Sequence, residues 1–99
     1  MLNLNELNIR TFDVKLKSGE ILHINPPKVK VLRKTQDLLK KSDKDIELIV
    51  DATVMVLNSN SKKKVFDRKY VEENFDVNDI GKVLQGYLSW VAQIQKSPN

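Results

Sequence analysis

The chain has 99 residues, which suits one domain with a single hydrophobic core and leaves little room for a second. It contains no cysteine, which excludes a disulfide framework, a thiolate metal site and a cysteine nucleophile. No apolar run approaches the roughly 20 residues of a membrane span, and the first residues lack the pattern of a signal peptide. We therefore expect a cytoplasmic protein with no membrane partner.

Residues 9–25 are predicted to form a β-hairpin. Apolar Phe12, Val14 and Leu16 alternate with charged residues, which is typical of a strand with one buried face. A three-residue loop over residues 17–19, with Gly19 in the left-handed conformation, keeps the apolar residues of both strands on one face. The register predicted in this way pairs Phe12 with Ile24, Val14 with Leu22 and Leu16 with Glu20.

Two helices are predicted next, over residues 27–41 and 43–58. Pro26 and Pro27 end the second strand, and Pro27 suits the first turn of a helix. The second helix is apolar over much of its girth and is therefore expected at the centre, with Ser42 and Asp43 as candidate N-caps. Its expected buried stripe is Ile46, Ile49, Val50, Thr53, Val54 and Leu57.

Two more helices are predicted over residues 67–74 and 77–96. Asp67 is a candidate N-cap for the shorter one, and Asp76 caps the longer one with Asp79 three residues on. These elements predict an α+β fold in which a hairpin packs on a bundle of three to four helices, in a single domain over residues 1–99. Residues 1–8 and 97–99 are expected to be flexible ends. The expected core stripe of the long helix is Ile80, Val83, Leu84, Tyr87, Val91 and Ile94.

Basic residues are concentrated in two places, and the formal net charge of the chain is +4. A basic patch can attract nucleic acid, although a net charge of this size is also ordinary for the surface of a small domain. A nucleic-acid-binding domain is therefore kept as an alternative function, and binding of nucleic acid is not the favoured one. The residues that would carry it are Lys28, Lys30, Arg33 and Lys34, together with Lys62, Lys63 and Lys64.

No constellation of residues predicts catalysis, a metal site or a cofactor. His23 is the single histidine, and it could be combined with Ser18 and Asp13 only because serine and aspartate are common. Gly81 and Gly86 lie inside a predicted helix and lack the Gly-Lys-Ser/Thr of a phosphate loop. These two glycines instead predict close helix packing or a flat surface for a partner helix.

The plan of the whole chain resembles the small tail assembly chaperones of long-tailed phages and prophages of Gram-positive bacteria. The resemblance rests on the run YVEENF at residues 70–75, the acidic cap and helix that follow, the Tyr-x-x-Trp-Val of residues 87–91, and the Lys-Ser-Pro-Asn tail. It also includes the hairpin, the first helix ending in LLKK and the second ending in LNSN.

The resemblance implies a non-catalytic protein that acts in the host cytoplasm. Such a chaperone binds the tape measure protein, assists polymerisation of the tail tube protein and leaves before the virion is complete. A longer frameshifted form of the chain and a homo-oligomer are further expectations. Apolar helix-face residues would bind the partner, and we expect these to be Tyr87, Leu88, Trp90, Met55 and Val56.

Overall fold

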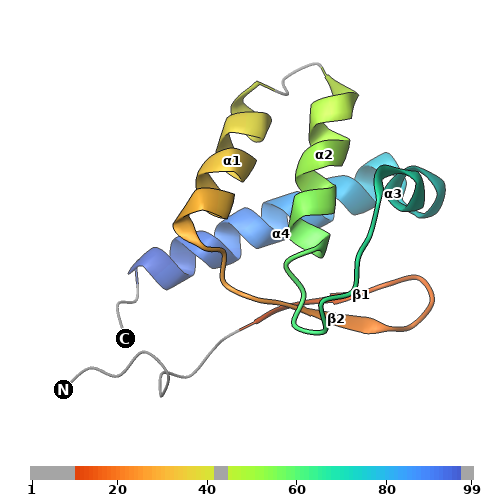
Figure 1. Ribbon diagram of the computed structural model, residues 1–99, viewed down its shortest axis with the longest axis horizontal. Helices are drawn as coiled ribbons and strands as arrows, with labels where there is room; N and C mark the ends of the chain where they lie inside the picture. The colour runs from red at the N-terminus through yellow and green to blue at the C-terminus, as the bar shows by residue number, and fades with distance from the viewer. Residues whose placement is uncertain (1–10, 42–44, 97–99) are drawn as a thin grey trace.

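The computed structural model describes residues 11–41 and 45–96. It contains β1 (Phe12–Lys15), β2 (Ile21–Ile24), α1 (Val29–Lys40), α2 (Ile46–Leu57), α3 (Arg68–Asn74) and α4 (Val77–Lys96). The predicted α+β fold, a hairpin followed by four helices, is confirmed. In Figure 1, α1 and α2 lie side by side, α4 crosses behind them, and the hairpin lies below.

The hairpin has the predicted register and the predicted three-residue turn. Phe12 pairs with Ile24 and Val14 with Leu22, while the amide of Leu16 donates to the carbonyl of Glu20 at 2.8 Å. Gly19 has a φ of 95°, in the left-handed region that the turn requires. The strands are shorter than the range 9–25, because β1 begins at Phe12; residues 9 and 10 lie outside the described residues.

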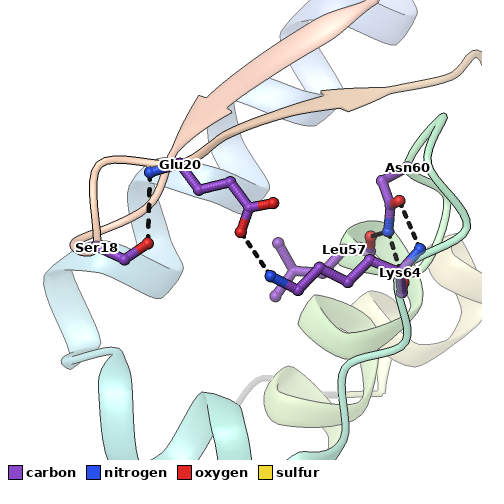
Figure 2. Close-up of polar contacts among 5 residues, drawn as sticks. All are labelled: Ser18, Glu20, Leu57, Asn60 and Lys64. Carbon is purple, nitrogen blue, oxygen red and sulfur yellow. Dashed lines mark hydrogen bonds and ion pairs between the residues drawn. The ribbon is translucent and has the colours of Figure 1, made fainter.

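The segment that follows α2 closes the outer edge of β2. Asn25 donates to the carbonyl of Ser59 at 2.9 Å, Ser61 donates to the carbonyl of His23 at 2.8 Å, and Asn60 forms a bridge with Ile24. Figure 2 shows Asn60 holding this segment together. Its side-chain amide donates to the carbonyls of Leu57 at 2.8 Å and Lys64 at 2.7 Å, and its side-chain oxygen accepts from the amide of Lys64 at 2.9 Å.

The first two helices begin later than predicted. Lys28 is extended, with a ψ of 155°, so α1 starts at Val29 and cannot include Pro27 in its first turn. Helix α2 starts at Ile46, where the side chain of Asp45 accepts from the amide of Glu47 at 3.0 Å. The predicted caps Ser42 and Asp43 lie outside the described residues.

The last two helices have the predicted caps. The side chain of Asp67 accepts from the amide of Tyr70 at 2.8 Å, and Arg68 then pairs with Glu47 and Asp51 of α2. At α4, Asp76 and Asp79 each accept from the other's amide, at 2.7 and 2.9 Å.

An ion pair joins the hairpin turn to the start of α4. The Nζ of Lys17 lies 2.8 Å from the Oδ2 of Asp79. The hydrogen bond from Lys17 has the largest effect on the pKa of Asp79 and lowers it below its ordinary value. The hydrogen bond from the amide of Asp76 has the next largest effect and also lowers it. Because Lys17 is exposed and Asp79 is half-exposed, solvent weakens the contact, which orients the hairpin on α4 more than it stabilises the fold.

Helix α2 is central, as predicted, because it packs against α1, α3, α4 and β2. The predicted stripe of α4 is buried from Ile80 to Val91. The predicted stripe of α2 was wrong at Ile46, which is 50% exposed, whereas Ala52 and Val56, which lie beside the stripe next to Ile49, are buried. Helix α2 turns this broader face inward because it is surrounded on several sides by α1, α3 and α4.

Candidate partner-binding groove

An apolar groove runs between α1 and α4, over the first turns of α2. Helices α1 and α4 both pack against α2 but, within the described chain, no Cα atom of α1 comes within 8 Å of one in α4. The groove has a volume of about 300 Å³. The residues that line it are Leu39 of α1, Ile46 and Ile49 of α2, and Val77, Ile80, Gly81, Leu84, Gln85 and Leu88 of α4.

The floor and the rim of this groove differ in exposure. Ile80 and Leu84 form the floor and are only 6% and 7% exposed, because they also belong to the core. On the rim, Val77 is 75% exposed, Ile46 is 50% exposed and Leu88 is 36% exposed. These three are among the large apolar side chains left open to solvent, and they gather at one place, which is typical of a protein-binding surface.

The N-caps of two helices place the rim side chains. Asp45 caps α2, so Ile46 becomes its first helical residue, and Asp76 caps α4, so Val77 takes the same position there. Both side chains therefore sit at helix starts and line the groove. Leu88, eleven residues after Val77 along α4, marks the other end.

Gly81 opens the middle of the groove. A Cβ built at Gly81 would meet nothing within 4 Å, so an alanine could stand there without displacing any described neighbour. Glycine in a helix interior destabilises the helix by about 1 kcal/mol relative to alanine. The chain thus carries a helix-weakening residue at a place where packing does not require one.

The groove continues at its Leu88 end into a shallower depression of about 400 Å³. Gln36, Leu39, Lys40 and Leu88 line this depression. It adds a polar amide and one cation to a surface that is otherwise apolar. A bound segment would therefore lie with its apolar side against α4 and could place an acidic residue near Lys40.

Two of the five predicted partner-binding residues are buried. Tyr87 is 0% exposed and Val56 is 1% exposed, and both belong to the core. Tyr87 faces the hairpin and makes an edge contact with Phe12. In this fold the two side chains form no part of the accessible surface, and we remove them from the candidate site.

The other three predicted residues lie on different faces. Leu88 lines the groove. Trp90 is half-buried and stacks on Phe12, with ring centroids 5.8 Å apart, so it faces the hairpin. Met55 is half-buried in α2, where its carbonyl accepts from the hydroxyl of Ser59 at 3.1 Å. Of the five predicted residues, only Leu88 lies in the groove.

The remaining groove residues were missed for reasons that can be traced. Ile46, Ile49 and Ile80 were assigned to core stripes, and helical spacing alone does not say which end of a stripe is covered. The signals that were available are Val77, an apolar residue outside the stripe of α4, and Gly81, a glycine without a turn to explain it.

The basic residues of the alternative function are all exposed. Lys30, Arg33 and Lys34 lie on the outer face of α1, and Lys28 precedes that helix. Lys62, Lys63 and Lys64 lie in the segment that closes the edge of β2. Lys64 is engaged by Glu20 at 2.5 Å, which lowers the pKa of Glu20, and it also lies over the ring of Phe66.

The residues named for a possible triad are only partly together. His23 Nδ1 lies 2.7 Å from a carboxylate oxygen of Asp13 on the exposed face of the hairpin. The hydrogen bond from the hydroxyl of Thr11 has the largest effect on the pKa of Asp13 and lowers it. The hydrogen bond with His23 has the second largest effect and also lowers it. Ser18 stands in the turn, where its hydroxyl accepts from the amide of Glu20 at 3.4 Å. Ser18 is therefore not positioned as a nucleophile by His23 and Asp13.

Within residues 11–41 and 45–96, no group of three or more His, Cys, Asp or Glu side chains lies in a geometry that could hold a metal ion. None of the helices in these ranges combines the length and the apolar character that crossing a bilayer demands.

Comparisons of this chain with protein-family models, with curated proteins and with solved structures found no match.

Proposed function

We propose that this protein is a non-catalytic tail assembly chaperone whose groove between α1 and α4 holds the apolar side of a helix in the tape measure protein. The observation that carries the proposal is the groove itself, with Ile46, Val77 and Leu88 exposed around an apolar floor. The sequence resemblance of residues 70–75 and 87–91 to phage tail assembly chaperones supplies the identity of the partner.

The dimensions of the groove suit an amphipathic helix. From Val77 to Leu88 the groove follows α4 for about 16 Å, which matches three turns of a partner helix. Gly81 lies in the middle, and the absence of a side chain there lets a partner backbone or a large side chain approach α4 closely. A groove of this kind binds apolar side chains at helical spacing and has little specificity for which apolar residues they are.

A short apolar groove also suits a temporary partner. Contact over three helical turns is small compared with a stable protein interface, so each site would release its client readily. In the host cytoplasm the chaperone would cover apolar stripes of the tape measure protein until the tail tube protein replaces it. A longer frameshifted form of the chain could bring in the tube protein through its extension.

The test is capture of partners by a tagged protein in cells that express the phage tail genes, with identification by mass spectrometry. Recovery of the long helical tape measure protein is expected. Val77→Glu charges the rim, Gly81→Leu fills the groove, and both should abolish capture. Val65→Glu is the matched control, because Val65 is a valine 83% exposed outside the groove, and it should leave capture unchanged.

Two results would overturn the proposal. One is equal capture of the tape measure protein by the wild type and by both groove variants. The other is recovery of nucleic acid that moderate salt releases, with loss of binding when Lys30, Arg33 and Lys34 are replaced by Gln. That second result would favour the alternative function through the exposed basic face of α1.

A further inference from the structure

The two edges of the hairpin differ in whether their backbone groups have hydrogen-bond partners. The outer edge of β2 is closed from His23 onward by residues 59–61. For β1, the bond from the amide of Leu16 to Glu20 shows which residues point toward β2. Hydrogen-bonded pairs alternate along an antiparallel ladder, so Val14 and Phe12 also bond β2, while the amides and carbonyls of Asp13 and Lys15 point away from it.

The outward edge of β1 is open among the described residues. No backbone partner of Asp13 or Lys15 on that side occurs in residues 11–41 and 45–96. A groove of about 260 Å³ follows the edge and is lined by every residue from Phe12 to Lys17. Side chains alternate between the two faces of a strand, so a groove lined by all four residues of β1 follows the edge of that strand.

The far wall of this edge groove is mostly apolar. Phe75 and Val83 line it together with Asp79 and Lys82, while Val14 of β1 is only half-buried. An unpaired edge beside an uncovered apolar surface is the setting in which a further strand is added to a sheet. The chemistry required of that strand follows from the charges along the edge.

We propose that the open edge of β1 pairs with β1 of a second copy of this chain, in antiparallel register about a two-fold axis at Val14. In that register Asp13 lies opposite Lys15 of the second copy, and Lys15 lies opposite its Asp13. Val14 meets its own counterpart on the inward face, and Phe12 meets Leu16. Asp13 and Lys15, whose backbone groups point away from β2, thus each gain a ladder partner of opposite charge.

Neighbouring registers are disfavoured by the same charges. Moving the axis by one residue, to Asp13 or to Lys15, places two aspartates or two lysines directly opposite each other. Moving the axis by half a residue places residues whose backbone groups point away from β2 opposite residues whose backbone groups already bond β2, so the ladder cannot form. A lysine on an edge strand commonly keeps other strands away, but here a carboxylate two residues earlier makes the edge complementary to itself.

The test is the concentration dependence of molecular mass, measured by analytical ultracentrifugation. Four-residue edges make a small interface, so association is expected only toward about 1 mM, where the mass should rise from 11.4 kDa toward twice that value. Asp13→Lys and Lys15→Asp each replace two attractive pairs by two repulsive ones, and each should weaken association at least about tenfold. Circular dichroism checks that both variants fold.

Charge reversal makes the test specific. A mixture of the Asp13→Lys and Lys15→Asp proteins should form a mixed dimer although neither protein associates alone. The double variant D13K/K15D should associate with itself again. Lys15→Pro removes an outward amide that bonds nothing in the monomer, and it should abolish association, while Lys15→Gln retains part of it.

Three results would overturn the inference: a wild type that stays monomeric at the highest concentration, single charge variants that associate like the wild type, or undiminished association of Lys15→Pro. A chain whose edge is taken by its own N-terminal residues or by a partner peptide would give the first result. The variant Val77→Glu should associate normally, so the inference stands or falls independently of the proposed function.

Discussion

The two helical glycines of α4 allow one substitution to be tested in opposite surroundings. A Cβ at Gly81 would meet nothing within 4 Å, whereas a Cβ at Gly86 would lie 2.9 Å from the Cζ of Phe12 and 3.2 Å from its Cε1. Both glycines stand inside α4. Alanine at either position therefore brings the same gain in helix propensity, and the two variants differ in what the added methyl group meets.

The expected magnitudes follow from that difference. Gly81→Ala should raise the free energy of unfolding by about 1 kcal/mol, which corresponds to about 4–8 °C in Tm for a domain of this size. Gly86→Ala gains the same amount but must displace the Phe12 ring, which is held between Tyr87 and Trp90. Overpacking of this kind costs about 1–3 kcal/mol, so Gly86→Ala should be neutral to destabilising.

Urea denaturation of the wild type and both variants measures the difference directly. Trp90 is the single tryptophan of the chain and stacks on Phe12, so its emission should change in Gly86→Ala and stay constant in Gly81→Ala. Phe12→Leu shortens the obstructing side chain and should reduce the penalty of Gly86→Ala in a double-mutant cycle. Equal stabilisation by both alanines, with unchanged emission, would refute the packing of Phe12 on Gly86.

Three further predictions concern the core and the closed edge of β2. Tyr87→Phe removes a buried hydroxyl that has no hydrogen-bond partner among the described residues, and should stabilise the protein by about 1 kcal/mol in urea denaturation; a loss of stability would contradict this. Burial raises the pKa of Tyr87 from 10.0 to about 12, so the folded protein keeps a proton that the unfolded chain loses. The contribution of Tyr87 to the free energy of unfolding is then fully present below pH 10 and is lost between pH 10 and 12, by at most about 3 kcal/mol. The free energy of unfolding of Tyr87→Phe, measured against pH, should lack this part of the loss. Asn60→Ala leaves the carbonyls of Leu57 and Lys64 without their donor and should cost about 2–3 kcal/mol; Asn60→Asp, which keeps the acceptor but not the donor, should be no better, and wild-type stability of either variant would refute the role of Asn60.

Local chemistry explains why much of the fold could be predicted. The turn at residues 17–19 depends on one glycine and on the alternation of apolar residues, and both are properties of adjacent positions. The caps at Asp67 and Asp76 likewise act on amides within three residues. By contrast, α1 starts after Pro27 because Lys28 is extended, a conformation that proline in the preceding position does not dictate.

The candidate groove could be predicted only in part, because it depends on which faces the helices leave uncovered. The stripe of α4 was predictable from helical spacing, and so was the central place of α2 from its composition. Tyr87, however, was placed both in the core stripe and in the partner-binding set, and Val56 only in the latter; both are buried, while Ile46 was expected in the buried stripe and is 50% exposed.

The amino-acid sequence by itself therefore determined the elements, their order, the hairpin register and most caps, since these depend on residues a few positions apart. The tertiary structure alone decided that α1 and α4 flank α2 without closing on each other, and that residues 59–61 close β2 while β1 stays open among the described residues. Exposure of a side chain is set by segments distant in the chain, which spacing along one helix or strand cannot reveal.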